Sequence, residues 1–211
     1  MARIETMKRI IMLLVLLTGI GMAARAQSSE AESLFTKELK EKCSGINSIE
    51  CRFVQTRSSS VLARNADKEG RYYFLQPYNI LLAFDDGDYI KINSTMFEMR
   101  QNGQSSSTRV SSNPMLKSLN RMLTACISGD ASQILRGNVS EITAGEDEFI
   151  LRMQPQRGRS GKKTETLIIF DRADMALKLM KIQEPSGDFL QYRFFDVEYN
   201  SAVDPSLFEI K

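Results

Sequence analysis

The side chains that could carry out chemistry in this sequence are carboxylates, lysines and thiols, because its 211 residues include no histidine. Without histidine, Ser-His and Cys-His nucleophile pairs, histidine metal sites and the commonest general base at neutral pH are excluded. An enzyme would then need a pair of carboxylates inside a cavity. The acidic residues lie mainly at predicted turns instead. We therefore expect a non-enzymatic protein that uses no cofactor.

Three aspartates lie close together and could be taken for a calcium loop: Asp85, Asp86 and Asp88. They lack the D-x-D-x-D-G spacing and the closing glutamate of such a loop. Asp86-Gly87 is a strong signal for a two-residue hairpin turn. We interpret this acidic run as a turn that binds no metal.

A basic segment, RGRSGKKT at residues 157–164, superficially resembles a phosphate-binding loop. It lacks the four-residue gap between the glycines, and it lies between two predicted strands instead of preceding a helix. The simplest interpretation is a solvated hairpin tip. Contact with an anionic lipid or an acidic partner is the alternative.

The N-terminus has the layout of a secretory signal peptide. Lys8 and Arg9 precede an apolar run at 10–22, and Ala24-Arg25-Ala26 supplies an A-x-A cleavage site. The run is shorter than the roughly 20 apolar residues of a membrane-spanning helix. We expect residues 1–26 to be removed and residues 27–211 to form a single domain.

The charge of the processed chain is close to balanced. Residues 1–26 contain four of the 28 basic residues and one of the 26 acidic residues, which leaves 24 and 25. A protein that binds nucleic acid through its electrostatic footprint needs a clear basic excess. We expect no nucleic-acid partner.

Cys43, Cys51 and Cys126 are an odd number of thiols for an exported chain. Cys43 and Cys51 lie on either side of the Gly45 turn and could form a disulfide. The alternative is that all three are small buried hydrophobic residues. No C-x-x-C spacing suggests a zinc site.

Two helical regions are expected. Ser29 and Glu32 form a capping box for a short N-terminal helix with a sparse apolar stripe at 34–43. In the middle of the chain, Asn113 and Pro114 begin a helix whose broad apolar face extends to Ile127 before Gly129. Asp130 can cap a second short helix that ends at Leu135. The apolar face either packs in a core or forms a lid over a cavity.

Strands dominate the rest of the chain. From Ile49 the apolar period becomes two, so that Ile49, Cys51 and Phe53 point one way and Arg52 and Val54 the other. Further strands are expected at 71–75, 79–85, 89–93, 96–101, 139–143, 148–153, 166–171, 177–183 and 189–199. About ten antiparallel strands with these helices predict an α+β chain, mainly β, in which an unclosed barrel carries helices over its open side.

Four segments together resemble the LolA-type periplasmic outer-membrane lipoprotein carrier family. They are Phe53-Val54-Gln55, the segment from Gly70 to Pro77, Asp86-Gly87, and the segment from Asn200 to Phe208. Their order and spacing cover nearly the whole processed chain. Two departures stand out: Gln76 lies where these carriers usually have arginine, and tryptophan is absent. The missing arginine concerns the lid contacts that tune release of the cargo.

This resemblance implies an unclosed β-barrel with a helical lid and an apolar cavity that shields the acyl chains of lipoproteins or related lipids. The carriers of the family work in the periplasm, accept cargo from an inner-membrane lipoprotein-release complex driven by ATP, and pass it to an outer-membrane acceptor. They hydrolyse nothing themselves. We expect a monomer. The alternative function is an envelope interaction module of the same fold that senses lipids or peptides without transporting them.

The residues expected to line the cavity follow from strand alternation and from the lid helix. Exposing an acyl chain of about 14 methylenes to water costs roughly 11 kcal/mol at about 0.8 kcal/mol per methylene, so a carrier needs an apolar lining. The candidates are Phe53, Phe74, Leu82, Ile90, Phe97, Leu119, Met122, Leu123, Ile169 and Phe194.

Overall fold

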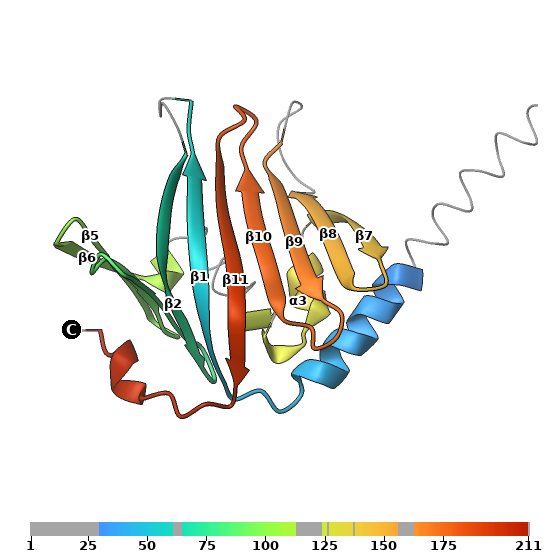
Figure 1. The fold of residues 1–211 in the computed structure, drawn as a ribbon, viewed down its shortest axis with the longest axis horizontal. Helices are drawn as coiled ribbons and strands as arrows, with labels where there is room; N and C mark the ends of the chain where they lie inside the picture. Colours follow the sequence, from blue (N-terminus) through green and yellow to red (C-terminus); the bar gives the residue numbers. More distant parts are fainter. Residues whose placement is uncertain are drawn as a thin grey trace, which may run out of the picture.

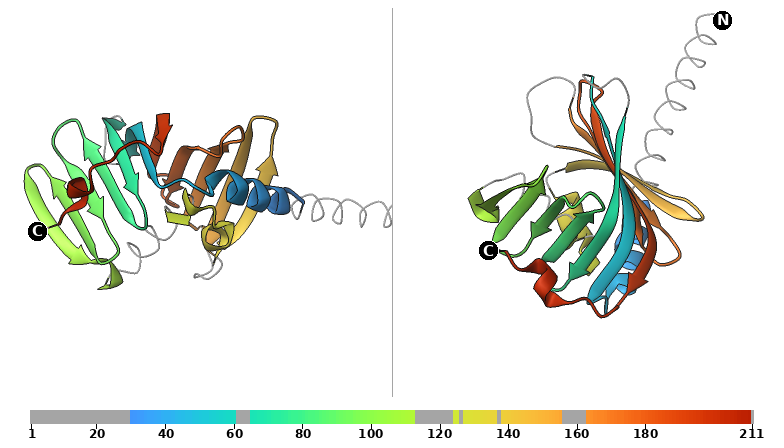
Figure 2. Two further views of the ribbon diagram at one scale, coloured as in Figure 1. Left: turned by 90° about the horizontal axis from the view of Figure 1, so that it is seen from below. Right: turned by 60° about the vertical axis from the view of Figure 1, so that its left-hand side comes forward.

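A single antiparallel sheet of eleven strands forms the centre of the protein in a computed structural model that describes residues 30–60, 65–112, 124–125, 127–136, 138–155 and 163–210. The strand order is β6-β5-β4-β3-β2-β1-β11-β10-β9-β8-β7, and the sheet curls around a concave face (Figures 1 and 2). Within the described residues, β6 and β7 at the two ends do not pair with each other. The barrel is therefore unclosed.

The strands follow the chain as two meanders that meet in the middle of the sheet. Their bounds are β1 Ser48–Ser58, β2 Ala66–Leu75, β3 Asn79–Phe84, β4 Tyr89–Ile92, β5 Met96–Gln101, β6 Gln104–Arg109, β7 Asn138–Ala144, β8 Glu148–Pro155, β9 Glu165–Asp171, β10 Leu177–Gln183 and β11 Phe189–Tyr199. The last strand, β11, returns to pair with β1, with Phe53 opposite Phe194. This pairing joins the β1–β6 meander to the β7–β11 meander.

Alternation along β1 fixes which face of the sheet is concave. Ile49, Cys51 and Phe53 are buried, whereas Arg52 is exposed, so the predicted period of two is confirmed for this strand. Directly opposite residues of antiparallel strands point to the same face. The pairing of each strand with its neighbours therefore extends this assignment across the sheet.

The N-terminal helix spans residues 30–43 and lies across the concave side of the β7–β10 half (Figure 2). Its apolar stripe is buried at Phe35, Leu39 and Cys43. The Phe35 ring lies 5.5 Å from the Phe149 ring and 5.4 Å from the Phe170 ring, measured between centroids. These contacts attach the helix to β8 and β9.

Two short helical pieces lie in the middle of the chain. Residues 124–125 and 127–128 are helical, and α3 (Ala131–Leu135) follows. Asp130 caps α3 by accepting a hydrogen bond from the backbone N–H of Gln133, as predicted. Residues 113–123 and 126, which include most of the predicted lid helix, lie outside the described residues. No described helix has the length and apolar character needed to cross a membrane.

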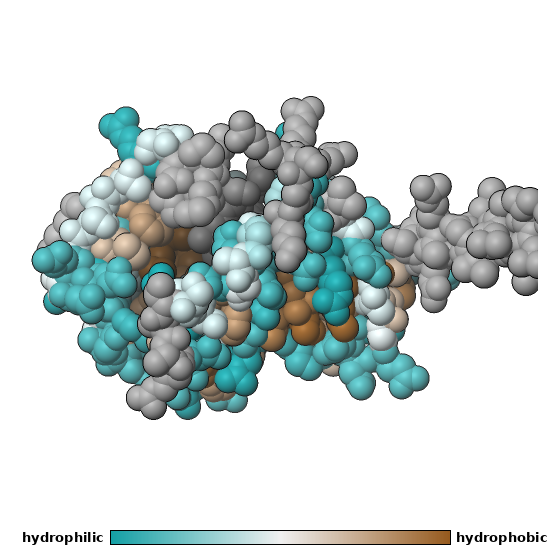
Figure 3. Space-filling view, turned by 90° about the horizontal axis from the view of Figure 1, so that it is seen from above, coloured by the Kyte–Doolittle hydropathy of each residue, from teal (hydrophilic) through white to brown (hydrophobic). Residues whose placement is uncertain are grey.

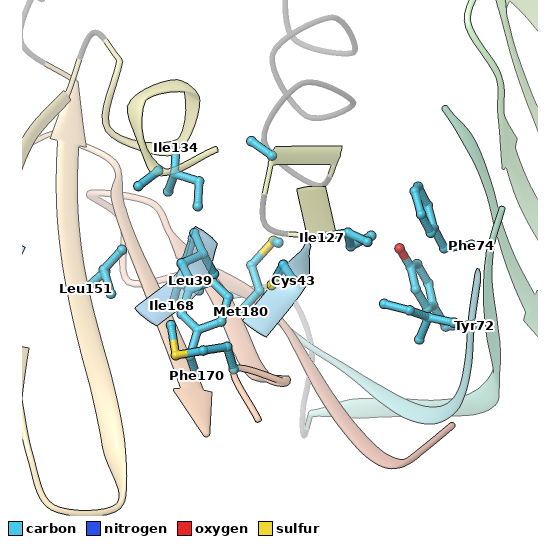
Figure 4. Packing of buried hydrophobic residues seen from close by; sticks show 14 of the residues in the cluster. Leu39, Cys43, Tyr72, Phe74, Ile127, Ile134, Leu151, Ile168, Phe170 and Met180 are labelled. Atoms are coloured by element: carbon cyan, nitrogen blue, oxygen red, sulfur yellow. The ribbon is translucent and has the colours of Figure 1, made fainter. Parts of the chain in front are cut away.

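Buried side chains form one hydrophobic core beneath the curled sheet. Figure 4 shows Leu39, Ile168, Phe170 and Met180 on one side of Ile127, and Tyr72 and Phe74 on the other side. The first group comes from the N-terminal helix, β9 and β10, and the second from β2. Ile127 thus lies between the two halves of the core.

The outer face of the β3 region is covered by the end of the chain. A 3-10 helix, η2 (Pro205–Phe208), packs against β3. Leu81 and Phe208 are both buried, although neither belongs to the main core. The Lys91 ammonium donates a hydrogen bond to the backbone carbonyl of Glu209, at 3.1 Å. The run of apolar residues in β3 is therefore covered on both faces.

The mainly β class and the unclosed barrel predicted from the sequence are confirmed. The prediction of about ten strands omitted β6. Its sequence, QSSSTR, contains no apolar residue and so gives no period-two signal. An edge strand paired only with β5 can be polar on both faces because little covers it.

Candidate functional site

The concave face of β1–β5 is apolar in two rows that cross the strands. One row runs from Phe74 through Ile80 and Ile92 to Phe97. The neighbouring row contains Cys51, Tyr72, Leu82, Ile90 and Met99. Burial decreases along both rows toward β5, because Phe74 and Tyr72 are buried whereas Phe97 and Ile90 are only partly covered. The surface is thus apolar without being fully packed.

An aromatic cluster lies beside these rows, where β1, β2, β3 and β11 meet. The Phe53 ring lies 5.2 Å from the Phe84 ring in an edge-to-face arrangement and 6.5 Å from the Phe194 ring. Tyr192 stacks on Phe194 with an interplanar angle of 14°, and Tyr72 meets Phe194 edge to face at 5.6 Å. We call these five rings the aromatic floor.

Gly70 makes the aromatic floor possible. It pairs with Phe53 on β1 and with Phe84 on β3, so it occupies the position between two rings. A Cβ added to Gly70 would collide with the backbone carbonyl oxygen of Ala83. The strands approach too closely here for any other residue. This is a physical reason for glycine in the segment from Gly70 to Pro77.

A partly open apolar cavity of about 40 Å³ adjoins the floor. Its lining comes from the end of the N-terminal helix, β1, β2, β11, the β9–β10 turn and the central helical piece: Cys43, Ile46, Ile49, Cys51, Tyr72, Ile127, Met175, Ala176, Leu177, Phe194, Val197 and Tyr199. A water needs about 10–15 Å³ by this measure, so the space holds a few small groups. It is much smaller than an acyl chain. Seen from above, hydrophobic atoms also lie deep in a hollow of the surface (Figure 3).

The two thiols beside the cavity are unreactive. Among the described residues, Cys43 and Cys51 are both buried and no disulfide joins them. Burial and the nearby Asp174 raise the pKa of Cys43 to about 11, and burial and Glu50 raise that of Cys51 to about 12. Both thiols stay protonated at neutral pH and are poor nucleophiles. The structure thus has these two as small buried residues, whereas Cys126 lies outside the described residues.

A polar clamp fixes the N-terminal helix beside the cavity. The Arg172 guanidinium forms an ion pair with Glu38 at 3.0 Å and donates to the backbone carbonyl of Gly145 at 2.6 Å. The Lys42 ammonium donates to the carbonyls of Arg172 and Ala173, at 2.6 and 2.8 Å. These contacts hold the N-terminal helix to the β7–β8 turn and to the β9–β10 turn, next to the wall of the cavity.

Most of the predicted lining residues that the structure describes lie on the concave face. Phe53, Phe74 and Leu82 are buried there, and the more open positions are Ile90, Phe97 and Phe194. Leu119, Met122 and Leu123 lie outside the described residues. The predicted lining did not include three aromatic residues of the concave face, Tyr72, Phe84 and Tyr192. Each lies two residues along its strand from a predicted lining residue and therefore on the same face.

Ile169 lies elsewhere, on the outer face of β9. Its neighbours Ile168 and Phe170 are buried in the core, so Ile169 points away from the concave surface. It borders an open outer groove of about 430 Å³ with Val54, Leu179 and Phe195. The run Leu167 to Phe170 is entirely apolar, so the sequence does not indicate which alternate residues face inward.

Comparison with known proteins identifies the fold family. The model of the family described as outer membrane lipoprotein carrier protein LolA matches residues 44–211, which include all eleven strands. The chain belongs to the LolA family. The resemblance predicted from the four sequence segments is confirmed. The carriers of the LolA family are non-enzymatic binding proteins.

Several solved structures are similar to this LolA-family chain at low sequence identity. A DUF1329 family protein from Desulfovibrio piger is 11% identical, with a TM-score of 0.48, over 87% of this chain and 97% of that one. A LolA superfamily protein from Nitrosomonas europaea is 9% identical, with a TM-score of 0.42, over 84% and 97%. A putative outer membrane lipoprotein-sorting protein domain from Vibrio parahaemolyticus is 12% identical, with a TM-score of 0.43, over 88% and 97%. A comparison with curated protein sequences found no significant match.

Proposed function

We propose that this protein is a periplasmic carrier that shields the acyl chains of lipoproteins, or of related lipids, against its concave surface. The observation that supports this proposal is the incomplete burial of apolar side chains on that surface in a chain of the LolA family. Ile90, Phe97, Phe194 and Val197 are partly covered, although they face the interior of the barrel. Apolar surface that stays partly open on the inner side of the barrel can be covered by an apolar ligand.

The energetics favour a lipid over a polar ligand at this surface. Each square ångström of apolar surface removed from water is worth about 25 cal/mol, and an acyl chain gains about 0.8 kcal/mol per buried methylene. Ligand and protein both gain when the open part of the aromatic floor is covered. Because the partly open cavity is only about 40 Å³, the concave surface has to open further to admit a chain.

The remaining parts of the proposal concern lining, route and partners. Phe53, Phe74, Leu82, Ile90, Phe97 and Phe194 form the sheet side of the lining, and Leu119, Met122 and Leu123 belong to the lid. A signal peptide at residues 1–26 directs export. An inner-membrane release complex supplies the acylated cargo to the monomeric carrier, and an outer-membrane acceptor receives it. No nucleic acid and no cofactor takes part.

A matched pair of substitutions tests the proposal. Ile90 and Ile169 are both partly buried isoleucines in strands, but Ile90 faces the concave surface and Ile169 the outer groove. We expect Ile90→Glu to abolish retention of lipoprotein, because a carboxylate in the lining repels acyl chains, and Ile169→Glu to retain it. Native mass spectrometry of protein purified from its own periplasm, followed by organic extraction, measures the bound cargo.

Two results would contradict the carrier function. Wild-type protein that carries no lipid and takes up no lipoprotein released from inner membranes would favour an interaction module. Equal loss of cargo in Ile90→Glu and Ile169→Glu, with both variants folded by circular dichroism, would show that the concave surface is not the binding surface.

A further inference from the structure

One row of inward-facing residues becomes polar where it reaches the aromatic floor. In register, Tyr192 on β11 lies opposite Gln55 on β1, which lies opposite Lys68 on β2. This row is next to the one that contains Phe194, Phe53 and Gly70. We call Tyr192, Gln55 and Lys68 the polar row. It borders a surface that is otherwise aromatic.

Contacts confirm that the polar row faces the same side as the floor. The Tyr192 ring is stacked on Phe194, with centroids 6.3 Å apart, and lies 6.1 Å from the Phe53 ring. Its hydroxyl oxygen accepts a hydrogen bond from the Gln55 amide, with Nε2 and Oη 2.7 Å apart. Gln55 is therefore held at the edge of the floor by the Tyr192 hydroxyl.

The Gln55–Tyr192 pair retains donors for a ligand. The amide has two N–H groups and the phenol one O–H, and the bond between them uses one donor in either orientation of the amide. Within the described residues, the phenol O–H has no further acceptor. Burial raises the pKa of Tyr192, so the hydroxyl keeps its proton at neutral pH. The pair therefore offers neutral hydrogen-bond donors beside apolar rings.

Lys68 does not supply a free positive charge. Its ammonium lies 2.6 Å from a carboxylate oxygen of Asp88 and 2.7 Å from one of Asp86. Asp88 has only 8% of its side chain exposed and also accepts from the backbone N–H of Asn102, at 2.8 Å. Two carboxylates thus face one ammonium, and the end of the polar row disfavours an anionic ligand.

We propose that the polar row binds the uncharged ester or amide carbonyl that joins an acyl chain to its head group. This inference rests on the proposed carrier function and assigns the chemical class that the edge of its site recognises. The acyl chain lies on the aromatic floor, and its carbonyl oxygen accepts a hydrogen bond from Tyr192 or Gln55. A hydrocarbon or an ionised fatty acid lacks this match, because the first has no acceptor and the second meets Asp86 and Asp88.

The test compares three probes built from eight-carbon chains, with two chains in each glycerol derivative and one in octanoate. 1,2-Dioctanoylglycerol contains two ester carbonyls, 1,2-dioctylglycerol has ether links instead, and octanoate is an anion. Each probe displaces the fluorescent dye bis-ANS from the protein, and the displacement gives its affinity. We expect the ester to bind about threefold to tenfold more tightly than the ether, as one or two neutral hydrogen bonds allow. Octanoate is expected to bind more weakly than either.

Tyr192→Phe keeps the ring and its stacking but removes the hydroxyl. We expect it to weaken ester binding about threefold to tenfold and to weaken ether binding less, because an ether oxygen is the poorer hydrogen-bond acceptor. Gln55→Leu should likewise reduce the preference for the ester. Tyr89→Phe is the matched control, because Tyr89 bonds Glu98 on the outer face, at 3.1 Å, and its loss should change neither affinity.

The outcomes separate this inference from the carrier function. The proposed role of the polar row would be wrong if the wild-type protein bound ester and ether with equal affinity. It would also be wrong if Tyr192→Phe lowered both affinities equally. Neither result would contradict an apolar binding site. Tighter binding of octanoate than of the ester would overturn the role of the polar row too. Failure of the wild-type protein to bind any of the probes or a purified lipoprotein would contradict the carrier function itself. The wild-type ratio of ester to ether affinity decides the point even where a variant is unstable.

Discussion

The two halves of the sheet use the same inward-facing row in different ways. From β7 to β10 this row consists of Ile142, Leu151, Ile168 and Met180, all buried. It continues over β11, β1 and β2 as Tyr192, Gln55 and Lys68, all partly exposed. One curled sheet thus contains a packed half, β7–β10, and an open half, β1–β5 with β11.

The difference follows from what covers each half. The N-terminal helix, with Phe35 and Leu39, and α3, with Ile134, fill the space beneath the packed half. In the open half, the described residues leave Phe97, Ile90 and Phe194 only partly covered. Stability and binding are therefore expected to depend on different residues. A fully packed protein could not provide both.

Removing one ring from each half gives the largest expected effect. Phe149 is fully buried against Phe35, so Phe149→Ala should lower the free energy of unfolding by about 3–5 kcal/mol. Phe194 is only partly buried, and Phe194→Ala should cost less than half as much while reducing lipid binding. Urea unfolding measures the stability of both variants. Far-UV circular dichroism is the suitable signal, because the chain contains no tryptophan for fluorescence. Equal losses would show that the open half is a core as well.

The clamp on the N-terminal helix gives a smaller expected effect. Arg172→Met removes the ion pair with Glu38 and the bond to Gly145 but keeps the length of the side chain. We expect a small loss of stability and faster hydrogen exchange in residues 30–43. Arg52→Met is the control, because its pair with Glu69 is largely exposed, and it should change stability little. Unchanged exchange in Arg172→Met would mean that apolar packing alone holds the helix.

The cysteines at the boundary of the halves predict a small pH effect. In the unfolded chain the Cys51 thiol loses its proton near its ordinary pKa, whereas in the folded protein burial raises its pKa to about 12. Unfolding at pH 10 therefore releases a proton, and stability falls as the pH rises from about 9 toward 12. For Cys51 this loss is on the order of 1 kcal/mol between pH 8 and pH 10. Cys51→Ala should flatten the dependence, and identical slopes for variant and wild type would show an accessible thiol.

Local signals in the sequence predicted much of the fold. Asp86 and Gly87 lie in the β3–β4 turn, which spans residues 85–88 and is longer than the predicted two-residue turn, and the amide of Gly87 donates to the carbonyl of Phe84. Asp130 caps α3, and the alternation from Ile49 to Phe53 fixes the inward face of β1. Each of these features depends on residues only a few positions apart. Local geometry and side-chain chemistry therefore determine them.

The lining of the site remains a prediction, but strand alternation in the sequence gave the inward direction of some of its residues. Phe53 lies between the exposed Arg52 and the half-buried Val54, Phe74 lies between the half-buried Tyr73 and Leu75, and both point to the concave face. Ile169 lies in an apolar run, and its outward direction depends on the pairing of β9 with β8 and β10. Gln55 was not among the predicted lining residues, because a polar side chain is not expected at an apolar surface.

The sequence by itself determined the LolA-type fold class, the strands with clear alternation, and the absence of histidine chemistry. Only the tertiary structure decided that Tyr192 meets Gln55, that Lys68 is neutralised by Asp86 and Asp88, and that η2 packs against β3. These residues are far apart in the chain or lie on different strands. Their contacts depend on the register and curl of the whole sheet, which no short stretch of sequence encodes.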